Sequence, residues 1–239
     1  MPVTTSTHPA TLDASHLRAW LGLAADAIHE RRELLTRLDA AIGDADHGTN
    51  MDRGFGAVRA MLSTHHEEVP GGTLLTVAGS VLMSTVGGAS GALWGTAMRW
   101  AGSSLGAERQ FDAAALAAAL HAALEGIVEL GAARVGDKTM VDALEPAVAA
   151  MQRSIVDGAD LETALRSAIR AGDRGMRATV PMRAKKGRAS YLGDRSIGHQ
   201  DPGATSTMII LGALCEATAP GARRSGAQSF NARRVSSAA

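Results

Sequence analysis

Hydrophobic residues recur at helical spacing along most of the chain. Between residues 13 and 42, apolar side chains are separated by three, four or seven positions, at Leu17, Leu21, Ala24, Ile28, Leu35, Leu38 and Ile42. This spacing predicts one long amphipathic helix that ends at Gly43. Further helices are predicted over residues 50–65, 72–86, 92–102, 111–130, 139–154, 160–178 and 204–218. Because no run alternates apolar and polar residues as a half-buried strand does, we predict an all-α bundle of about eight amphipathic helices.

The composition indicates how these helices pack and where the domain ends. Of the 239 residues, 46% are hydrophobic, which suffices for a sizeable core, but only 3% are aromatic. We therefore expect small side chains to let the helices approach closely. Residues 220–239 lack helical spacing and are rich in Ser, Ala, Gly and Arg, as a disordered tail would be. The predicted organisation is an N-terminal arm over residues 1–10, a helical domain over residues 11–219, and this tail.

Charge and targeting features narrow the function classes. Lys plus Arg equals Asp plus Glu, so the formal net charge is zero and a nucleic acid or a membrane surface is a disfavoured partner. The single cysteine, Cys215, cannot form an internal disulfide. The first residues lack a basic segment followed by an apolar core, and no run approaches the roughly 20 apolar residues of a membrane span. We therefore predict a cytoplasmic protein.

Three aspartates, Asp39, Asp44 and Asp46, lie close together in LDAAIGDADHGTNM, residues 38–51. Two carboxylates about 4 Å apart repel by roughly 4 kcal/mol at an effective dielectric constant of 20, so three together require a cation or protonation. The simpler alternative is a solvated turn in which Asp44 or Asp46 caps the next helix. An EF-hand is excluded, because its invariant glycine would be Thr49 and its terminal glutamate Phe55. The metal hypothesis is an open oxygen-ligand site for Mg²⁺, which leaves its remaining positions to water and phosphates.

Two glycine-containing segments are candidate phosphate-binding sites. Gly48, Thr49 and Asn50 lead into the second predicted helix, and GGASG, residues 87–91, leads into another. Free backbone N–H groups at the positive end of a helix favour anions. Glycines at such positions also serve simply for tight helix packing, and this alternative stays open. The P-loop pattern GxxxxGK[ST] does not occur, and neither does GxGxxG after a strand.

A long polar loop, GRASYLGDRSIGHQDPGATS over residues 187–206, adds positive charge. Arg188 and Arg195 are candidate phosphate ligands with fork geometry, with a solvated surface charge as the alternative. Asp201-Pro202-Gly203 has the order of a cap, a first-turn proline and a glycine at a helix start. A loop of about twenty residues without periodicity inside a helical domain is more often functional than idle. Taken singly, His47 and His199 are interpreted as structural histidines.

Together the four motifs LDAAIGDADHGTNM, GGASG, GDKTM and GRASYLGDRSIGHQDPGATS resemble, in order and spacing, the L subunits of dihydroxyacetone kinases, which are similar to the nucleotide-binding domain of single-chain ATP-dependent kinases. The resemblance covers roughly residues 10–217. It implies an antiparallel barrel of eight helices with ADP and two Mg²⁺ ions at one end, the metals being held by Asp39, Asp44 and Asp46. The implied nucleotide contacts are His47, Gly48, Thr49, Asn50, Ala89, Ser90, Gly131, Met140, Arg188, Asp201, Pro202 and Gly203. The chain departs from the family at Ala92, where a proline is expected, and in the tail after Ala219.

The resemblance also implies a function. Phosphoryl transfer has a loose transition state whose charge must be neutralised, so Mg²⁺ and a catalytic Arg188 would supply most of the catalysis. In the family a separate K subunit binds the ketose, so we expect the chain to be half of an enzyme. In the phosphotransferase-system form, which a separate L chain favours, bound ADP is recharged to ATP by a phosphohistidine on an M subunit. In the other form ATP exchanges. A homodimer is expected.

Two rival hypotheses come from other classes of function. One is a non-catalytic ADP-binding regulator, since family members of this type can signal through a transcription activator. The other is a binding module for lipid inside the helical bundle, against which stands an ordinary packed core. The sequence does not identify the acceptor ketose, because the acceptor site belongs to another chain.

Overall fold

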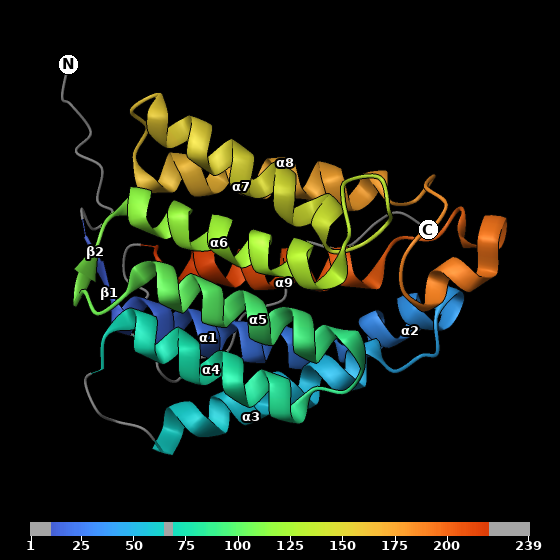
Figure 1. The fold of residues 1–239 in the computed structure, drawn as a ribbon, viewed down its shortest axis with the longest axis horizontal. Coiled ribbons are helices and arrows are strands. Elements are labelled where there is room, and N and C mark those ends of the chain that lie inside the picture. The colour runs from blue at the N-terminus through green and yellow to red at the C-terminus, as the bar shows by residue number, and fades with distance from the viewer. Residues whose placement is uncertain (1–10, 65–68, 220–239) are drawn as a thin grey trace.

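The computed structural model describes residues 11–64 and 69–219 of the chain (Figure 1). Within these ranges the secondary structure is almost entirely helical. The helices are α1 (Ala14–Glu30), α2 (Arg32–Ile42), α3 (His47–Thr64), α4 (Gly71–Thr85), α5 (Gly88–Leu105), α6 (Ala113–Gly131), α7 (Val141–Val156), α8 (Leu161–Ala178), the 3₁₀ helix η1 (Arg188–Ser196) and α9 (Pro202–Ala217). Two short strands, β1 (Leu12–Asp13) and β2 (Gln110–Phe111), form an antiparallel pair. The predicted arm and tail lie outside the described residues.

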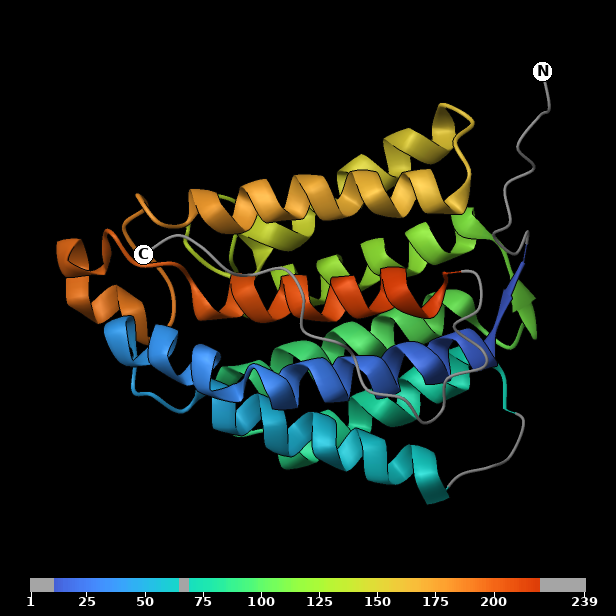
Figure 2. The same cartoon turned by 180° about the vertical axis from the view of Figure 1, so that it is seen from behind.

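Eight of the helices close into a ring. Along the ring each helix contacts the next, in the order α1, α3, α4, α5, α6, α7, α8 and α9, and α9 contacts α1. Neighbouring helices run in opposite directions, as Figures 1 and 2 show from opposite sides. The predicted all-α fold, an antiparallel barrel of eight helices, is confirmed. Helix α2 continues beyond α1 at one end of the barrel, where it contacts η1.

Aspartate side chains begin several of these helices. An aspartate precedes α1, α6, α8 and α9, and its carboxylate accepts a hydrogen bond from a first-turn backbone N–H group; these caps are Asp13, Asp112, Asp160 and Asp201. Such a bond satisfies one of the four backbone donors that a helix start leaves without a partner. The local sequence therefore determines where these helices begin.

The long helix predicted over residues 13–42 is interrupted. Arg31 adopts φ −105° and ψ 11°, and α1 and α2 are separate helices on either side of it. The apolar spacing continues through this break without glycine or proline, so the pattern alone could not reveal it. The reason lies in tertiary contacts, because α2 packs against α3, α9 and η1 at the end of the barrel. The strands were also unpredicted, since two residues are too few to show alternation.

Helices α4 and α5 approach each other through glycines. A β-carbon placed on Gly79 would lie 2.6 Å from the carbonyl oxygen of Gly95, and one placed on Gly102 would lie 2.5 Å from that of Gly72. Side chains at these positions would force the two helices apart. The expectation that small residues allow close helix packing, drawn from the low aromatic content, is confirmed for this pair.

The barrel interior is a packed apolar core. A cavity inside the ring has a volume of about 20 Å³ and is lined by apolar side chains that include Trp20, Trp94 and Met98. This is space on the order of a single water molecule, so a lipid chain would require the helices to move apart. The sequence is compatible with either a lipid-binding interior or an ordinary packed core, and the described residues favour the packed core.

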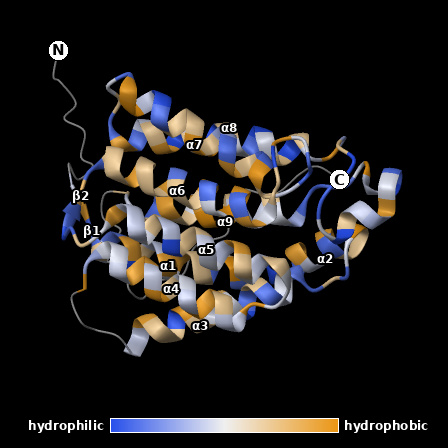
Figure 3. Cartoon of the chain, in the orientation of Figure 1, coloured by the Kyte–Doolittle hydropathy of each residue, from blue (hydrophilic) through white to orange (hydrophobic). Residues whose placement is uncertain are grey.

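Helix α6 corrects one sequence prediction. Over the described residues, one helix, Ala113–Gly131, is long and apolar enough by length and composition to cross a membrane, although no run of that length was expected. In the ring it packs between α5 and α7, and 44% of its apolar stretch is buried. Hydrophobic and hydrophilic residues are interspersed along the other ring helices (Figure 3).

Candidate functional site

The antiparallel ring brings four helix starts to one end of the barrel. Helices α3, α5, α7 and α9 all begin there, next to α2 and η1 (Figure 1). Each start presents backbone N–H groups without helical partners and the positive end of a helix dipole. Of the residues expected to lead into helices, Gly48–Asn50 and Gly88–Gly91 lie within the first turns of α3 and α5, and Gly87 is the cap residue before α5. This end of the barrel is therefore suited to an anion.

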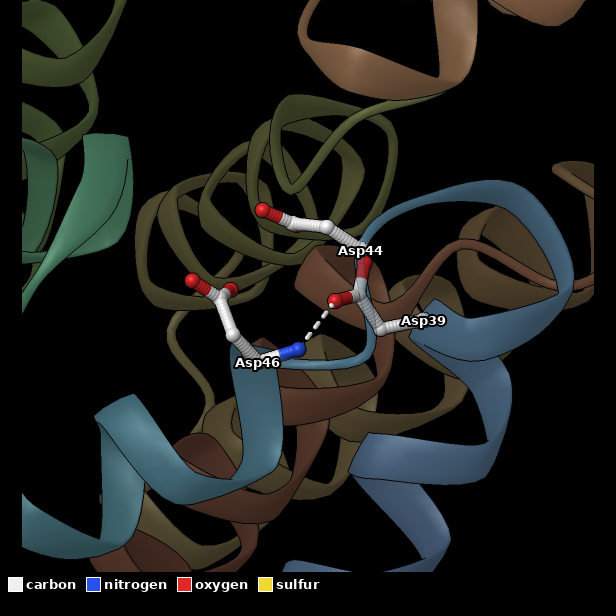
Figure 4. Close-up of side chains that lie close together, drawn as sticks. All are labelled: Asp39, Asp44 and Asp46. Carbon is white, nitrogen blue, oxygen red and sulfur yellow. Dashed lines mark hydrogen bonds between the residues drawn. The ribbon is translucent and has the colours of Figure 1, made fainter.

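Three carboxylates stand at the same end. Asp39 lies in the last turn of α2, and Asp44 and Asp46 lie in or beside the loop that leads to α3 (Figure 4). One carboxylate oxygen from each lies within 4.8 Å of the others. Ala45 between them adopts φ +63°, a left-handed conformation that is rare for alanine. The loop geometry thus brings the three carboxylates together despite their repulsion.

Asp39 is the fixed member of this cluster. It is buried, and its Oδ2 accepts hydrogen bonds from the backbone N–H groups of Asp46 at 2.9 Å and His47 at 3.2 Å. A β-carbon on Gly43 would lie 2.1 Å from Asp39 Oδ1, so only glycine fits at that position. The backbone therefore orients one carboxylate, while Asp44 and Asp46 remain exposed.

The described residues provide one cationic partner for the cluster. The Nε atom of Arg188, at the start of η1, lies 2.8 Å from Asp44 Oδ2. One guanidinium balances one of three carboxylate charges. Oxygen donors with this excess of negative charge are the ligands that Mg²⁺ prefers, so the donor set fits a divalent cation. Arg195, the other candidate arginine, is exposed in the last turn of η1.

His47 connects three helix starts. Its Nδ1 lies 3.1 Å from Ser90 Oγ on α5, and its Nε2 lies 3.0 Å from Ser206 Oγ on α9. The Ser206 hydroxyl also lies 3.0 Å from the carbonyl oxygen of Gly203, and the imidazole tautomer decides which ring nitrogen donates. Burial lowers the pKa of His47, although the charges of Asp39 and Asp46 oppose this shift. The ring is therefore neutral near pH 7.

The remaining residues of the first α3 turn pack against neighbouring segments. A β-carbon on Gly48 would lie 2.1 Å from the carbonyl oxygen of Arg32, so α3 can begin against α2 only with glycine there. Thr49 is exposed. Asn50 Oδ1 accepts a hydrogen bond from Arg53 at 2.7 Å, which fixes the amide beside GGASG. In that segment Ala89 is exposed within the first turn of α5.

The starts of α7 and α9 lie side by side. Met140, the residue before α7, is buried, and a β-carbon on Gly203 would lie 3.6 Å from its Cβ. Asp201 accepts a hydrogen bond from Ala204 N at 2.7 Å, and Pro202 is the first residue of α9. Burial raises the pKa of Asp201 to about 7. Gly131, the last residue of α6, faces Leu93 of α5. Every residue predicted for the site therefore lies at this end of the barrel.

A comparison with known protein families agrees with this arrangement. The family described as the DAK2 domain matches residues 41–216, which is most of the chain. The chain belongs to the DAK2 domain family. This DAK2 domain is 39% identical over 201 residues to the ADP-binding subunit DhaL of the PEP-dependent dihydroxyacetone kinase of Escherichia coli (strain K12), with 84% of this chain and 95% of that protein aligned.

Two longer proteins contain a similar domain. The D-erythrulose kinase of Mycolicibacterium smegmatis is 37% identical over 195 residues, which is 81% of this chain but 33% of the kinase. The crystal structure of the dihydroxyacetone kinase from C. freundii in complex with AMP-PNP and Mg²⁺ shares the fold at a TM-score of 0.65 and 24% identity, over 90% of this chain and 37% of that one. The DAK2 domain thus spans about a third of these kinases.

Sequence patterns do not reveal two residues at this end of the barrel. Ser206 is 159 residues from His47, and a single serine in an apolar helix carries no signal of such a contact. Lys138 is fully buried in the loop between α6 and α7. The motif GDKTM contains this lysine, but no spacing within the motif indicates a buried ammonium.

Proposed function

We propose that the chain is the nucleotide-binding phosphoryl-transfer subunit of a dihydroxyacetone kinase. In this proposal it passes phosphate from a Mg²⁺-bound nucleotide to dihydroxyacetone held on a separate K-type subunit. The observation that carries the proposal is the position of three carboxylates at the barrel end where four helices begin. Carboxylates that hold Mg²⁺, beside backbone donors that hold phosphate, are the two parts that nucleotide phosphoryl transfer requires.

Asp39, Asp44 and Asp46 would hold the metal, which we propose to be two Mg²⁺ ions. Bound Mg²⁺ supplies neutralisation of the phosphate charge. The three carboxylates differ in what supports them, because Asp39 is fixed by two backbone N–H groups whereas Asp44 and Asp46 are exposed. Asp39 would therefore act as the rigid reference ligand, and the other two would adjust to it.

The nucleotide would lie across the four helix starts. Residues of α3 (His47, Gly48, Thr49, Asn50), α5 (Ala89, Ser90), the α6–α7 segment (Gly131, Met140) and α9 (Asp201, Pro202, Gly203) are its proposed contacts. The hydrogen bonds of His47 to Ser90 and Ser206 hold α3, α5 and α9 in one arrangement. Backbone N–H groups fixed in this way can receive phosphate oxygens without reorganisation, which is the basis of electrostatic catalysis.

Arg188 would stabilise the transferred phosphate. Its side chain is 70% exposed, and its contact with Asp44 places the guanidinium beside the carboxylate cluster. An exposed ion pair contributes little to stability, so exchanging Asp44 for phosphate oxygens costs little. A guanidinium can form two parallel hydrogen bonds to phosphate, which suits a group whose charge develops during transfer.

The acceptor and the donor would come from other chains. The relative from E. coli is named as a subunit and is aligned over nearly its full length, whereas the single-chain kinase relative is about three times as long. We propose that a K-type subunit holds the ketose and that a phosphohistidine-carrying M subunit recharges ADP to ATP. Exchange of free ATP is the alternative donor. The cytoplasmic location and the homodimer remain predictions.

Reconstitution tests the proposal. The purified chain is mixed with a K-type subunit, dihydroxyacetone and Mg²⁺, with either ATP or a phosphorylated M subunit, and dihydroxyacetone phosphate is measured. We expect product only when both chains are present, and none with Asp44→Asn. The control variant Asp157→Asn removes an exposed carboxylate after α7 and should leave the rate unchanged.

Each outcome of this assay has a distinct meaning. Product from the chain and free ketose without a second subunit would contradict the half-enzyme proposal. ADP binding without transfer from either donor would instead favour the alternative of a non-catalytic regulator that acts through a transcription activator. The same assay with erythrulose in place of dihydroxyacetone tests the acceptor that the name of the M. smegmatis relative suggests.

A further inference from the structure

Lys138 places a buried ammonium group in a cage of backbone carbonyls. Its side chain is 1% exposed. The Nζ atom lies within hydrogen-bond distance of the carbonyl oxygens of Thr179 at 2.8 Å, Ser196 at 2.8 Å and Met182 at 3.2 Å, and of that of His199, so its three N–H groups are shared among four acceptors. Four carbonyl oxygens that converge on one charged nitrogen resemble the coordination of a small cation.

This site requires a lysine. An ammonium is a compact point charge, whereas the planar guanidinium of arginine spreads its donors in a fork and cannot direct them to four oxygens around one nitrogen. The chain otherwise uses arginine, since only three of its 24 basic residues, Lys138, Lys185 and Lys186, are lysines. Lys138 also adopts φ +64°, a conformation that costs roughly 1–2 kcal/mol for a residue with a side chain. Contacts elsewhere must compensate for this strain.

The loop that carries Lys138 is held independently of the ammonium. Asp142, at the start of α7, accepts hydrogen bonds from the backbone N–H groups of Gly136 at 2.6 Å and Thr139 at 2.7 Å. Lys138 therefore extends from a fixed loop toward the segment between α8 and α9. The α6–α7 loop is thus fixed by Asp142, and the segment between α8 and α9 is bound to it through Lys138.

The four carbonyls belong to the segment that presents Arg188. Thr179 follows the last residue of α8, Ser196 ends η1, and His199 precedes the cap of α9. Arg188 begins η1, and its guanidinium reaches Asp44. One ammonium thus joins the α6–α7 loop to the residues before η1 and to those at its end. No residue between 179 and 200 belongs to the main apolar cluster of the described residues, so polar contacts such as those of Lys138 hold this segment.

We propose that Lys138 is a positioning residue for phosphoryl transfer. Its ammonium holds the segment from Thr179 to His199, which contains η1, against the α6–α7 loop, so that Arg188 stays at the carboxylate cluster. The ammonium is buried in its carbonyl cage and acts only through these carbonyls, not on the substrate. This inference rests on the proposed function, because the rate it controls is the transfer of phosphate to the ketose.

The test compares Lys138→Met, which removes the charge at similar length, with the control Lys186→Met. Lys186 is a partly exposed lysine of the same segment, and its substitution leaves the ion pair between Lys185 and the buried Asp137 intact, so it should change little. We expect Lys138→Met to retain ADP affinity within about threefold but to slow single-turnover transfer on the order of a hundredfold, as for a displaced catalytic group. The loss should appear in kcat rather than in KM for nucleotide.

Two further readouts separate positioning from general stability. Hydrogen exchange should accelerate in Lys138→Met at the amides of Lys185 and Gly198, which bond to the carbonyls of Asp137 and Val180. The double variant Lys138→Met with Arg188→Lys should be no slower than the slower single variant, because both act through one arginine. If Lys138→Met does not fold, Lys138→Arg, which retains the charge but not the ammonium geometry, takes its place with the same expected losses.

Wild-type transfer in Lys138→Met, unchanged exchange at those amides, or additive effects in the double variant would each overturn the inference. Failure of the proposed function gives a different result. In that case the wild-type chain itself transfers no phosphate, while the exchange of the Lys185 and Gly198 amides still shows whether Lys138 holds the segment.

Discussion

Replacing Asp46 by asparagine should change stability in opposite directions with and without Mg²⁺. Asp46 is exposed, and one of its carboxylate oxygens lies within 4.8 Å of Asp39 and Asp44. Unlike Asp44, it has no cationic partner among the ion pairs of the described residues. Asparagine keeps the shape and one acceptor oxygen but removes the charge. In the absence of divalent cations the variant should therefore be the more stable protein.

The magnitude follows from the separation. Two unit charges 4.8 Å apart repel by about 0.9 kcal/mol at the dielectric constant of water and by about 3.5 kcal/mol at an effective value of 20. Because Asp46 is exposed, the lower figure applies, and Asp44 repels it in the unfolded chain as well. The relief is thus about 1 kcal/mol, mainly from Asp39, which raises the melting temperature of a domain of this size by about 2–4 °C.

With Mg²⁺ the order should reverse. A cation present at 100 times its dissociation constant stabilises the folded state by about 2.7 kcal/mol, and most of this should be lost when one of three charged ligands is removed. The assay is thermal unfolding of the wild-type chain, Asp46→Asn and the control Asp157→Asn, in EDTA and in Mg²⁺. If Asp46→Asn is less stable than the wild type in EDTA, or gains as much stability from Mg²⁺ as the wild type does, Asp46 is not a metal ligand.

Three other predictions concern packing, pH and catalysis. Gly95→Ala should destabilise the fold by about 1–3 kcal/mol in urea denaturation, because its Cβ would lie 2.1 Å from Met83 Cγ, whereas Gly56→Ala, with no atom within 4 Å, should stabilise it by up to about 1 kcal/mol. The pKa of Asp201 is about 7 in the folded protein and 3.8 in the unfolded chain, so its contribution to stability is present below about pH 4 and is lost as the pH rises toward 7. The wild type should therefore lose on the order of 2 kcal/mol of stability between pH 5 and pH 7 that Asp201→Asn does not lose, as measured by urea denaturation at each pH. Arg188→Lys should retain most ADP affinity by calorimetry yet slow transfer on the order of a hundredfold in the reconstituted assay.

The helical fold was largely predictable because each ring helix buries one face. Apolar spacing along residues 160–178, for example, matches the observed α8, and Asp160 marks its start. The break at Arg31 was not predictable, because α2 turns away from α1 through contacts with α3 and η1 rather than through a local signal. Order around the ring is likewise a tertiary property that residue spacing does not contain.

The carboxylate cluster was predictable for a local reason. Asp39, Asp44 and Asp46 lie on one helix end and the loop that follows, so chain connectivity alone brings them together. Contacts between distant segments were not. His47 meets Ser206 across the barrel end, and Lys138 binds backbone carbonyls, which every residue possesses and which no sequence pattern distinguishes.

The central claim is that this end of the barrel holds a nucleotide through Mg²⁺. Calorimetric titration of ADP into the nucleotide-stripped chain, once in Mg²⁺ and once in EDTA, tests it most directly. We expect saturable binding in Mg²⁺ that disappears in EDTA and in Asp44→Asn but persists in Asp157→Asn. Equal binding with and without the metal, or no binding in Mg²⁺, would contradict it.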